Sequence, residues 1–220
     1  MSVTVSTFLS RIALDLHEDS SFPPGRNNLW TLQEFLGYIN YAERDFLRRT
    51  GIAKTDTTVT VSPGNNILFA KPSGVMDIER ISFNYKRLRR VSTWDLERED
   101  PTWRSHPNGD PSYYHEDHLN VNYFEFDNVP ARGGFYRMFC DTLPAEHTAA
   151  ITSEVIAVND CWEPYIRWEV LSLAFAKDGD NQDTTRSQYA HDRYMVGVML
   201  AKRLVLGNSV FNFAEISGNA

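Results

Sequence analysis

A chain of 220 residues, 42% of them hydrophobic and 23% charged, is long enough to bury a full core without disulfides or metals. These shares are typical of globular proteins and argue against an extended disordered chain. The formal net charge of -7 argues against a protein that wraps DNA through its phosphates, because such binding needs a basic surface. The aromatic share of 13% favours a binding surface in addition to a core.

Cysteine usage and hydropathy indicate where the protein works. Cys140 and Cys161 form neither a metal-ligand pattern nor the framework of a secreted scaffold, so we expect two reduced thiols. Residues 1–16 lack the basic start and apolar run of a signal peptide, and no segment reaches the roughly 18 apolar residues of a membrane span. We therefore expect the protein to stay where it is made.

The first fifty residues have helical periodicity. Apolar residues recur on one face over 5–16, which predicts a first helix, and a loop with two prolines follows at 20–26. Thr31 and Glu34 form a capping-box pair at the start of a second periodic run. This second helix should end near Gly51.

The middle of the chain changes to the period of a strand. Residues 57–61 alternate β-branched side chains, 62–66 supply turn residues, and 67–70 return as the second arm of a predicted hairpin. The other predicted elements are strands at 78–85, 119–126 and 135–140, a short capped helix at 93–100 and an irregular loop at 101–111. We expect a small, interrupted and mostly antiparallel sheet.

The chain becomes helical again from Trp162. Two periodic runs predict two helices, with a turn at 178–183 between them. In the last helix Met195, Val198 and Met199 widen the apolar stripe beyond what one packed neighbour needs, which suggests a second partner.

The tail after Gly207 carries apolar residues without periodic context. They are Val210, Phe211, Phe213 and Ile216. Apolar residues on a terminus usually dock, either within the chain or on another one.

One α+β domain is the simplest organisation, because no linker-like break interrupts the order of elements. We expect a helical bundle of two N-terminal and two C-terminal helices flanking a small, mostly antiparallel β-sheet. This domain would span 1–207, with a β-rich middle at about 56–158, and a C-terminal arm would follow at 208–220.

His115 and His118, with His106 upstream, form the histidine cluster of the sequence. Zinc proteases need two histidines one helical turn apart, whereas this pair lies in a Tyr-rich stretch bounded by proline. We expect a polar surface turn here and no metal.

Asp178, Asp180 and Gln182 have the spacing of the first ligands of a calcium loop. The sixth position is Asp183 instead of Gly, and the twelfth is Tyr189 instead of Glu. We expect a structural turn, and no cofactor anywhere in the chain.

Acids and aromatics lie close together in the middle of the sequence, as in a glycoside hydrolase, where two carboxylates flank a bound sugar. The acids are Glu97, Glu99, Asp100, Glu116 and Asp117, and the aromatics are Trp94, Trp103, Tyr113 and Tyr114. A solvated charged face beside buried aromatics explains them equally well. Because phosphate loops, nucleophile elbows and Cys-x-x-Cys pairs are absent, we expect no enzyme. A carbohydrate-binding or glycoside-hydrolase-like module is the alternative function.

One basic group, formed by Lys86, Arg87, Arg89 and Arg90, stands at the end of a predicted strand. It lacks the interleaved aromatics of a platform that stacks nucleic-acid bases. A contact with an acidic neighbouring subunit is the better interpretation, because subunit interfaces pair complementary charged faces.

Several local strings have a characteristic order along most of the chain. They are Leu29-Trp30-Thr31 leading into Leu36-Gly-Tyr-Ile-Asn-Tyr-Ala42-Glu-Arg44, the β-rich middle with Trp103, Pro111 and Tyr113-Tyr114, and Trp162-Glu-Pro-Tyr165 with Ser187-Gln-Tyr189. In these strings and in its order of elements, the chain resembles the head-to-tail adaptor (connector) proteins of tailed bacteriophages. Its β-rich middle is larger than in the minimal helical adaptors.

This resemblance implies a structural virion protein of the head-tail junction, made in the host cytoplasm. A ring of twelve copies would join the portal protein to the tail tube or nozzle protein and extend the DNA channel, with DNA only as passing cargo and no membrane involved. An acidic wall suits such a conduit, because it repels the phosphate backbone. The family's helical core forms the ring, and its C-terminal arm, which reaches the portal, would fall on 208–220.

Overall fold

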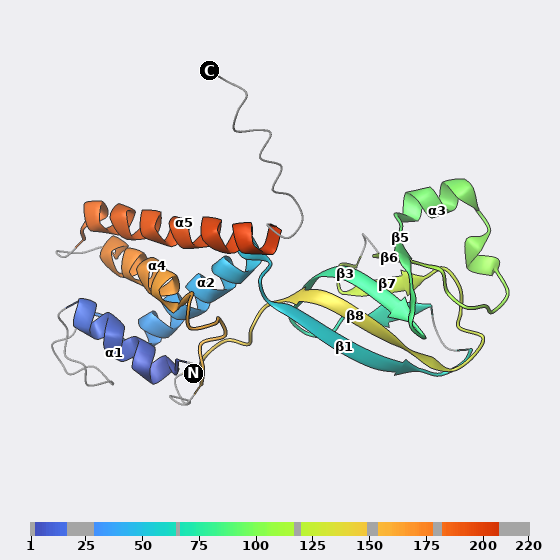
Figure 1. The fold of residues 1–220 in the computed structure, drawn as a ribbon, viewed down its shortest axis with the longest axis horizontal. Coiled ribbons are helices and arrows are strands. Elements are labelled where there is room, and N and C mark those ends of the chain that lie inside the picture. The colour runs from blue at the N-terminus through green and yellow to red at the C-terminus, as the bar shows by residue number, and fades with distance from the viewer. Residues whose placement is uncertain are drawn as a thin grey trace, which may run out of the picture. The chain divides into compact units, whose positions relative to one another are not determined.

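The computed structural model describes residues 3–16, 29–64, 67–116, 120–148, 154–177 and 182–206 (Figure 1). The chain divides into two compact units. A helical unit combines Met1–Ala53 with Leu143–Ala220, and a β unit is the continuous stretch Lys54–Thr142. The prediction of a single domain over 1–207 with an arm at 208–220 stays a prediction.

The helical unit contains α1 (Val5–Asp15), α2 (Leu32–Thr50), α4 (Glu163–Ala176) and α5 (Thr184–Leu206). The predicted capping box is confirmed, since the Thr31 hydroxyl accepts from the Glu34 amide and the Glu34 carboxylate accepts from the Thr31 amide. Gly51 ends α2 with a φ of 60°, the left-handed conformation that glycine adopts without steric cost.

The helices of this unit share one apolar core. α4 contacts α1, α2 and α5, and it runs alongside α5 in Figure 1. Phe8, Ile39 and Ile166 are buried in this core, and each contributes roughly 1.5–3 kcal/mol by leaving water. Gly197 allows a close approach, because a Cβ there would lie 2.3 Å from Cγ of Tyr165.

The β unit contains eight strands in the residues that the structure describes. They are β1 (Lys54–Val61), β2 (Leu68–Ala70), β3 (Val75–Phe83), β4 (Lys86–Arg87), β5 (Arg89–Arg90), β6 (Tyr113–Glu116), β7 (Tyr123–Phe126) and β8 (Gly134–Thr142). They form two four-stranded sheets, in the orders β1-β8-β3-β4 and β2-β7-β6-β5. Every pair is antiparallel except β5 with β6. Between β5 and β6 lie α3 (Thr93–Glu99), capped by Ser92, and a 3-10 turn at Trp103–Ser105.

Both sheets pack their aromatic side chains into one core. Phe69 of β2 lies 5.5 Å from Tyr136 of β8 between ring centroids, and Phe83 of β3 lies 6.0 Å from Phe126 of β7. The strand predicted at 78–85 ends at Phe83, because Asn84 and Tyr85 adopt positive φ angles and turn the chain into β4.

The predicted hairpin of 57–61 with 67–70 is wrong. β1 pairs with β8, with Val59 opposite Tyr136, and β2 pairs with β7 in the other sheet, with Phe69 opposite Phe124. Turn residues favour a reversal of the chain but do not determine which strands pair. Because the core-facing side chains of both arms belong to the same core, the chain crosses from one sheet to the other here. The predicted single small sheet is therefore two sheets.

A mixed α+β fold is confirmed. Along the sequence, two N-terminal helices precede and two C-terminal helices follow a β region in which antiparallel pairs dominate. How the bundle and the sheets are arranged stays a prediction. No helix in the described ranges is long and apolar enough to cross a membrane.

Candidate functional site

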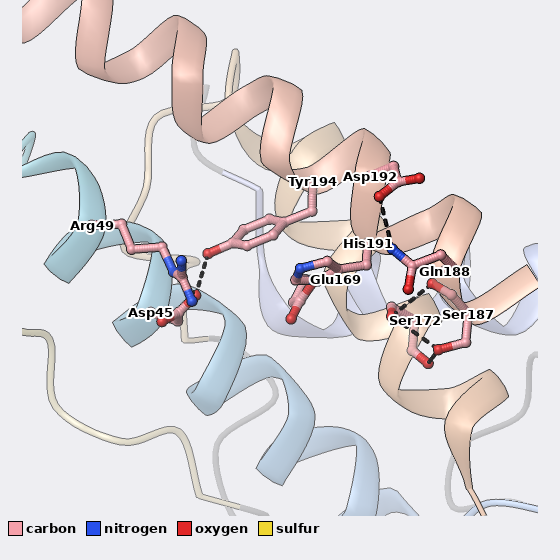
Figure 2. A network of polar contacts seen from close by, with 9 residues as sticks. All are labelled: Asp45, Arg49, Glu169, Ser172, Ser187, Gln188, His191, Asp192 and Tyr194. Carbon is pink, nitrogen blue, oxygen red and sulfur yellow. Dashed lines mark hydrogen bonds and ion pairs between the residues drawn. The ribbon is translucent and has the colours of Figure 1, made fainter. Parts of the chain in front are cut away.

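A buried polar network joins α2 to α5 (Figure 2). The Tyr194 hydroxyl donates to Oδ2 of Asp45 at 2.8 Å, and Nε of Arg49 donates to the same oxygen at 2.6 Å. Burial raises the pKa of Tyr194, and the Asp45 carboxylate raises it further, so the phenol stays protonated and can donate. The hydrogen bond to Asp45 also raises the pKa of Arg49. The network fixes the orientation of α5 on α2.

A second set of polar contacts joins α4 to α5. Nδ1 of His191 lies 2.9 Å from Oε2 of Glu169, whose pKa is raised by burial and lowered in part by this histidine. The hydroxyls of Ser172 and Ser187 each donate to the other residue's backbone carbonyl at 2.9 Å (Figure 2). These paired groups make α4 and α5 a rigid pair.

His147 clamps the segment after β8 onto α2. Its Nε2 lies 2.7 Å from Oε2 of Glu43 and its Nδ1 lies 2.8 Å from Oε2 of Glu154. The hydrogen bond to Glu43 raises the pKa of His147 most, against the opposing effect of burial, so the charged imidazolium is favoured. Asn40 exchanges two hydrogen bonds with the His147 backbone, at 2.8 and 3.1 Å. No sequence signal marks this histidine, because Glu43 and Asn40, its partners on α2, lie more than one hundred residues away along the chain.

The outward side of α2 and this clamped segment enclose a groove of about 710 Å³, which we call the α2 groove. Its lining includes Gln33, Gly37, Tyr41, Arg44, Leu143 and Glu146. Among the residues that the structure describes, nothing lies within 4 Å of a Cβ added at Gly37, so no described contact requires a glycine there. A glycine inside an exposed helix costs about 1 kcal/mol relative to alanine.

The outward side of α5 carries exposed apolar residues that we call the α5 stripe. They are Tyr189, Val196, Met199, Leu200 and Leu204, each between 40 and 65% exposed. The opposite side of α5 is packed, with Tyr194 and Val198 buried in the core of the unit. Of the three residues predicted to widen the stripe, Met199 is exposed, whereas Val198 and Met195 belong to the subunit's own packing.

The predicted basic group lies on β4 and β5, and all four side chains are exposed on either side of the buried Leu88. Arg90 is held within the unit, since it forms ion pairs with Asp77 at 3.1 Å and with Glu116 and donates to the Ile78 carbonyl at 3.3 Å. Lys86 donates to the Ser112 hydroxyl at 3.2 Å. Arg87 and Arg89 are therefore more available to an external partner than Lys86 and Arg90.

The predicted histidine turn is wrong for His115. This residue lies in β6 with 1% of its surface exposed, because α3 and the 3-10 turn cover it. Its Nδ1 lies 3.2 Å from the Thr93 hydroxyl and its Nε2 lies 3.2 Å from Glu125, while the Trp103 ring contacts it edge-on. His106 pairs instead with Asp100 at 2.7 Å. His118 lies outside the described residues.

The other candidates for chemistry are dispersed. Trp103 and Tyr114 are core residues, whereas Trp94 is 73% exposed and Glu97 and Glu99 are exposed on α3. Glu116 forms ion pairs with Lys71 and Arg90. Among the residues that the structure describes, no group of His, Cys, Asp or Glu side chains could hold a metal.

Several predicted site residues fall outside the description. They are Asp117, Asp178 and Asp180, and the tail residues Val210, Phe211, Phe213 and Ile216. Asp183, next to the predicted turn, accepts a hydrogen bond from the Arg186 amide at 2.9 Å at the start of α5. Cys140 and Cys161 are free thiols, as predicted.

Comparison with known protein families identifies the family of this chain. No curated protein matches the chain. The family model described as SU10 adaptor protein matches residues 3–202, which covers both units. Such a family of structural adaptors is typically non-enzymatic, and it implies contacts with other head and tail proteins in the virion. The chain belongs to the SU10 adaptor protein family and is a phage structural adaptor.

Proposed function

We propose that this protein forms the ring that joins the portal to the tail at the head-tail junction and extends the DNA channel. Family membership over residues 3–202 supports an adaptor role, and the α5 stripe is the observation that supports a ring. A helix that is fully packed on one side and apolar on the other needs a second partner, because exposed apolar surface gains free energy when it is buried.

The partners follow from this role. The protein would contact its own copies in a twelve-subunit ring, the portal protein on one side and the tail tube or nozzle protein on the other. Lys86, Arg87, Arg89 and Arg90 would meet acidic groups of a neighbouring subunit, with Arg87 and Arg89 making most of the contact, because Arg90 and Lys86 have partners within their own unit. DNA would pass along an acidic wall without binding, in keeping with the net charge of -7.

The tail would be the arm that reaches the portal. Val210, Phe211, Phe213 and Ile216 each gain roughly 1.5–3 kcal/mol on full burial, so the segment benefits from a groove on its partner. Truncation after Gly207 tests this assignment. We expect a stably folded protein that no longer binds the portal; a lower melting temperature with portal binding intact would show instead that the tail packs on its own subunit.

Ring formation itself is tested by mixing the purified protein with the portal of its phage. A docked neighbour raises the effective concentration for the next copy into the mM range, so weak lateral contacts suffice once the portal is present. Electron microscopy should show rings seated on the portal. Sedimentation of the same monomer with and without the portal would contradict the proposed function.

A further inference from the structure

We propose that β1 is a strand-addition site, where an extended segment of another virion protein pairs with the free edge of the strand. The ligand is an uncharged polypeptide segment, bound mainly through its backbone. An adaptor family implies contacts with other head and tail proteins, so such a partner is expected whether or not the copies form a ring.

β1 is the outermost strand of its sheet and has one free edge (Figure 1). Each of its eight residues pairs with β8, from Lys54 opposite Asp141 to Val61 opposite Gly134, without a bulge. In the part of the chain that the structure describes, no other strand pairs with it. At about 3.3 Å per residue the free edge is roughly 26 Å long. Because alternate residues of an antiparallel edge strand direct their N–H and C=O groups away from the partner strand, this edge leaves a row of backbone donors and acceptors unpaired.

The other edge strands are protected in ways that proteins normally use, whereas β1 is not. β2 has three residues, and β4 and β5 have two each, all of them Lys or Arg. Short edges and charged edges are poor templates for another strand. β1 has neither a proline nor a bulge, and over 57–61 it carries only β-branched, uncharged side chains, which favour strands. Its free edge is therefore the one most suited to an added strand among the described residues.

The two charged residues of β1 do not guard this edge. Lys54 forms an ion pair with Glu79 of β3. Asp56 accepts a hydrogen bond from Nε of Arg137 of β8 at 2.7 Å. Both charges are thus neutralised within the sheet, so an uncharged strand fits the edge better than an acidic or a basic one.

The incoming strand should alternate apolar and polar side chains. Val59 lies opposite the buried Tyr136 and Thr57 lies opposite the buried Met138, so both face the core. Val59 and Thr57 are nevertheless only half-buried, whereas Thr58 between them is exposed. A strand pleated in the same way would place apolar side chains beside Val59 and polar ones beside Thr58.

A second copy of this chain offers no matching strand in its described residues. Its other edge strands have only two or three residues. Pairing of β1 with β1 would join copies only two by two, because both free edges are then used. The partner that an adaptor holds is a different protein. We therefore assign the edge to another protein of the virion.

Hydrogen exchange tests whether the edge is paired. We expect the amides of β1 that exchange fast in the isolated subunit to exchange at least tenfold more slowly in purified virions, while the free edge of β2 changes little. Fast exchange of β1 in both states would overturn the site. Electron microscopy of the same virions shows independently whether a ring is present, so failure of the ring and failure of the strand pairing are separate results.

Crosslinking identifies the occupant. In a Cys161→Ser background, which removes the exposed native thiol, Thr58→Cys carries a thiol-linked photo-crosslinker into the virion. We expect mass spectrometry to find it attached to a segment of another virion protein. Attachment to β1 of a second copy or to residues 208–220 would overturn the assignment. Truncation after Gly207 should also leave the exchange of β1 in the isolated subunit unchanged; faster exchange would mean that the tail already covers the edge, against the proposal.

Thr57→Lys tests the same site by substitution. An inward-facing lysine on an edge strand reaches solvent past the free edge, so it obstructs an added strand and leaves the fold intact. We expect a melting temperature close to that of the wild type and at least tenfold weaker binding of the crosslinked protein. Leu68→Lys, which places the same charge on the edge strand β2 at a residue that is 39% exposed, should bind normally. Equal binding by Thr57→Lys and the wild type would overturn the site.

Discussion

The helical unit and the β unit differ in what they bury and what they expose. The helical unit buries charged and polar groups in specific pairs, such as Glu43 with His147, and leaves the apolar α5 stripe in solvent. The β unit buries mainly clustered aromatics, with the His115–Glu125 pair beside them, and exposes arginines on β4 and β5. Paired buried charges fix orientation and exposed apolar surface drives association, so the helical unit has the properties of a rigid assembly element. The β unit offers charged surface, which favours selectivity and encounter rate over affinity.

Core truncations should separate the two units most clearly. Phe46→Ala removes a buried ring of the helical core and Phe126→Ala removes one of the β core. Each should lower the free energy of unfolding by about 3–5 kcal/mol. Hydrogen exchange measured by mass spectrometry should show faster exchange mainly within the mutated unit. Equal acceleration in both units for either variant would mean that the two cores behave as one.

Removal of the Tyr194 hydroxyl should have the next largest effect. In Tyr194→Phe the ring remains in the core, but Asp45 loses a hydrogen bond to its charged carboxylate. Such bonds contribute about 1.5–3 kcal/mol, and chemical denaturation measures the loss. Tyr38→Phe is the control, since Tyr38 lies at the edge of the same core. If Tyr194→Phe unfolds at the wild-type denaturant concentration, the network does not hold α5.

The His147 clamp should make the helical unit sensitive to pH. The folded-state pKa of His147 is raised above its ordinary value of about 6.5, so its contribution is fully present below that pH and is lost as the pH rises through the folded pKa. We therefore expect the unfolding free energy to decrease on that rise in the wild type, and to change less in His147→Gln. Melting temperatures of both proteins across this pH range give the comparison. A parallel pH dependence in the two would show that other groups cause it.

Charge reversal on the β unit should change assembly without changing stability. Arg87→Glu and Arg89→Glu alter exposed side chains, and such substitutions usually shift the free energy of unfolding by less than about 0.5 kcal/mol. Assembly on the portal should nevertheless be slower and more sensitive to salt. Arg90→Glu is the contrasting variant, because it also breaks the pairs with Asp77 and Glu116 and should melt earlier. Unchanged assembly rates in the first two variants would remove the basic group from the interface.

Gly37→Ala should have a small and stabilising effect. Because no described atom lies within 4 Å of the added Cβ, this change should stabilise the isolated subunit by about 0.5–1 kcal/mol through helix propensity. A subunit no more stable than wild type would mean that Gly37 has a structural role within the chain.

Periodicity predicted the helical unit well and the β unit less well, for a physical reason. Helical hydrogen bonds are local, so Thr31, Glu34 and Gly51 mark the bounds of α2 in the sequence itself. Strand partners are distant, and nothing in 57–70 shows that β1 pairs with β8 and β2 with β7. The turn residues predicted a hairpin, whereas in the structure the strands before and after them belong to different sheets.

The interaction surfaces were predictable only in part. The apolar excess on the last helix indicated a second partner, yet the sequence could not show that Val198 is buried and Met199 exposed, because both fit a wide stripe. His147 and the α2 groove arise from contacts between segments about one hundred residues apart. His115 was predicted to lie in a surface turn because its stretch is Tyr-rich and bounded by proline, whereas α3 and Trp103 cover it in the fold.

Cryo-electron microscopy of this protein assembled on its portal tests the central claim most directly. We expect a closed ring in which the α5 stripe of each copy, centred on Val196 and Leu200, is buried against another subunit. A ring in which the stripe faces solvent, or contacts only the portal, would contradict the account.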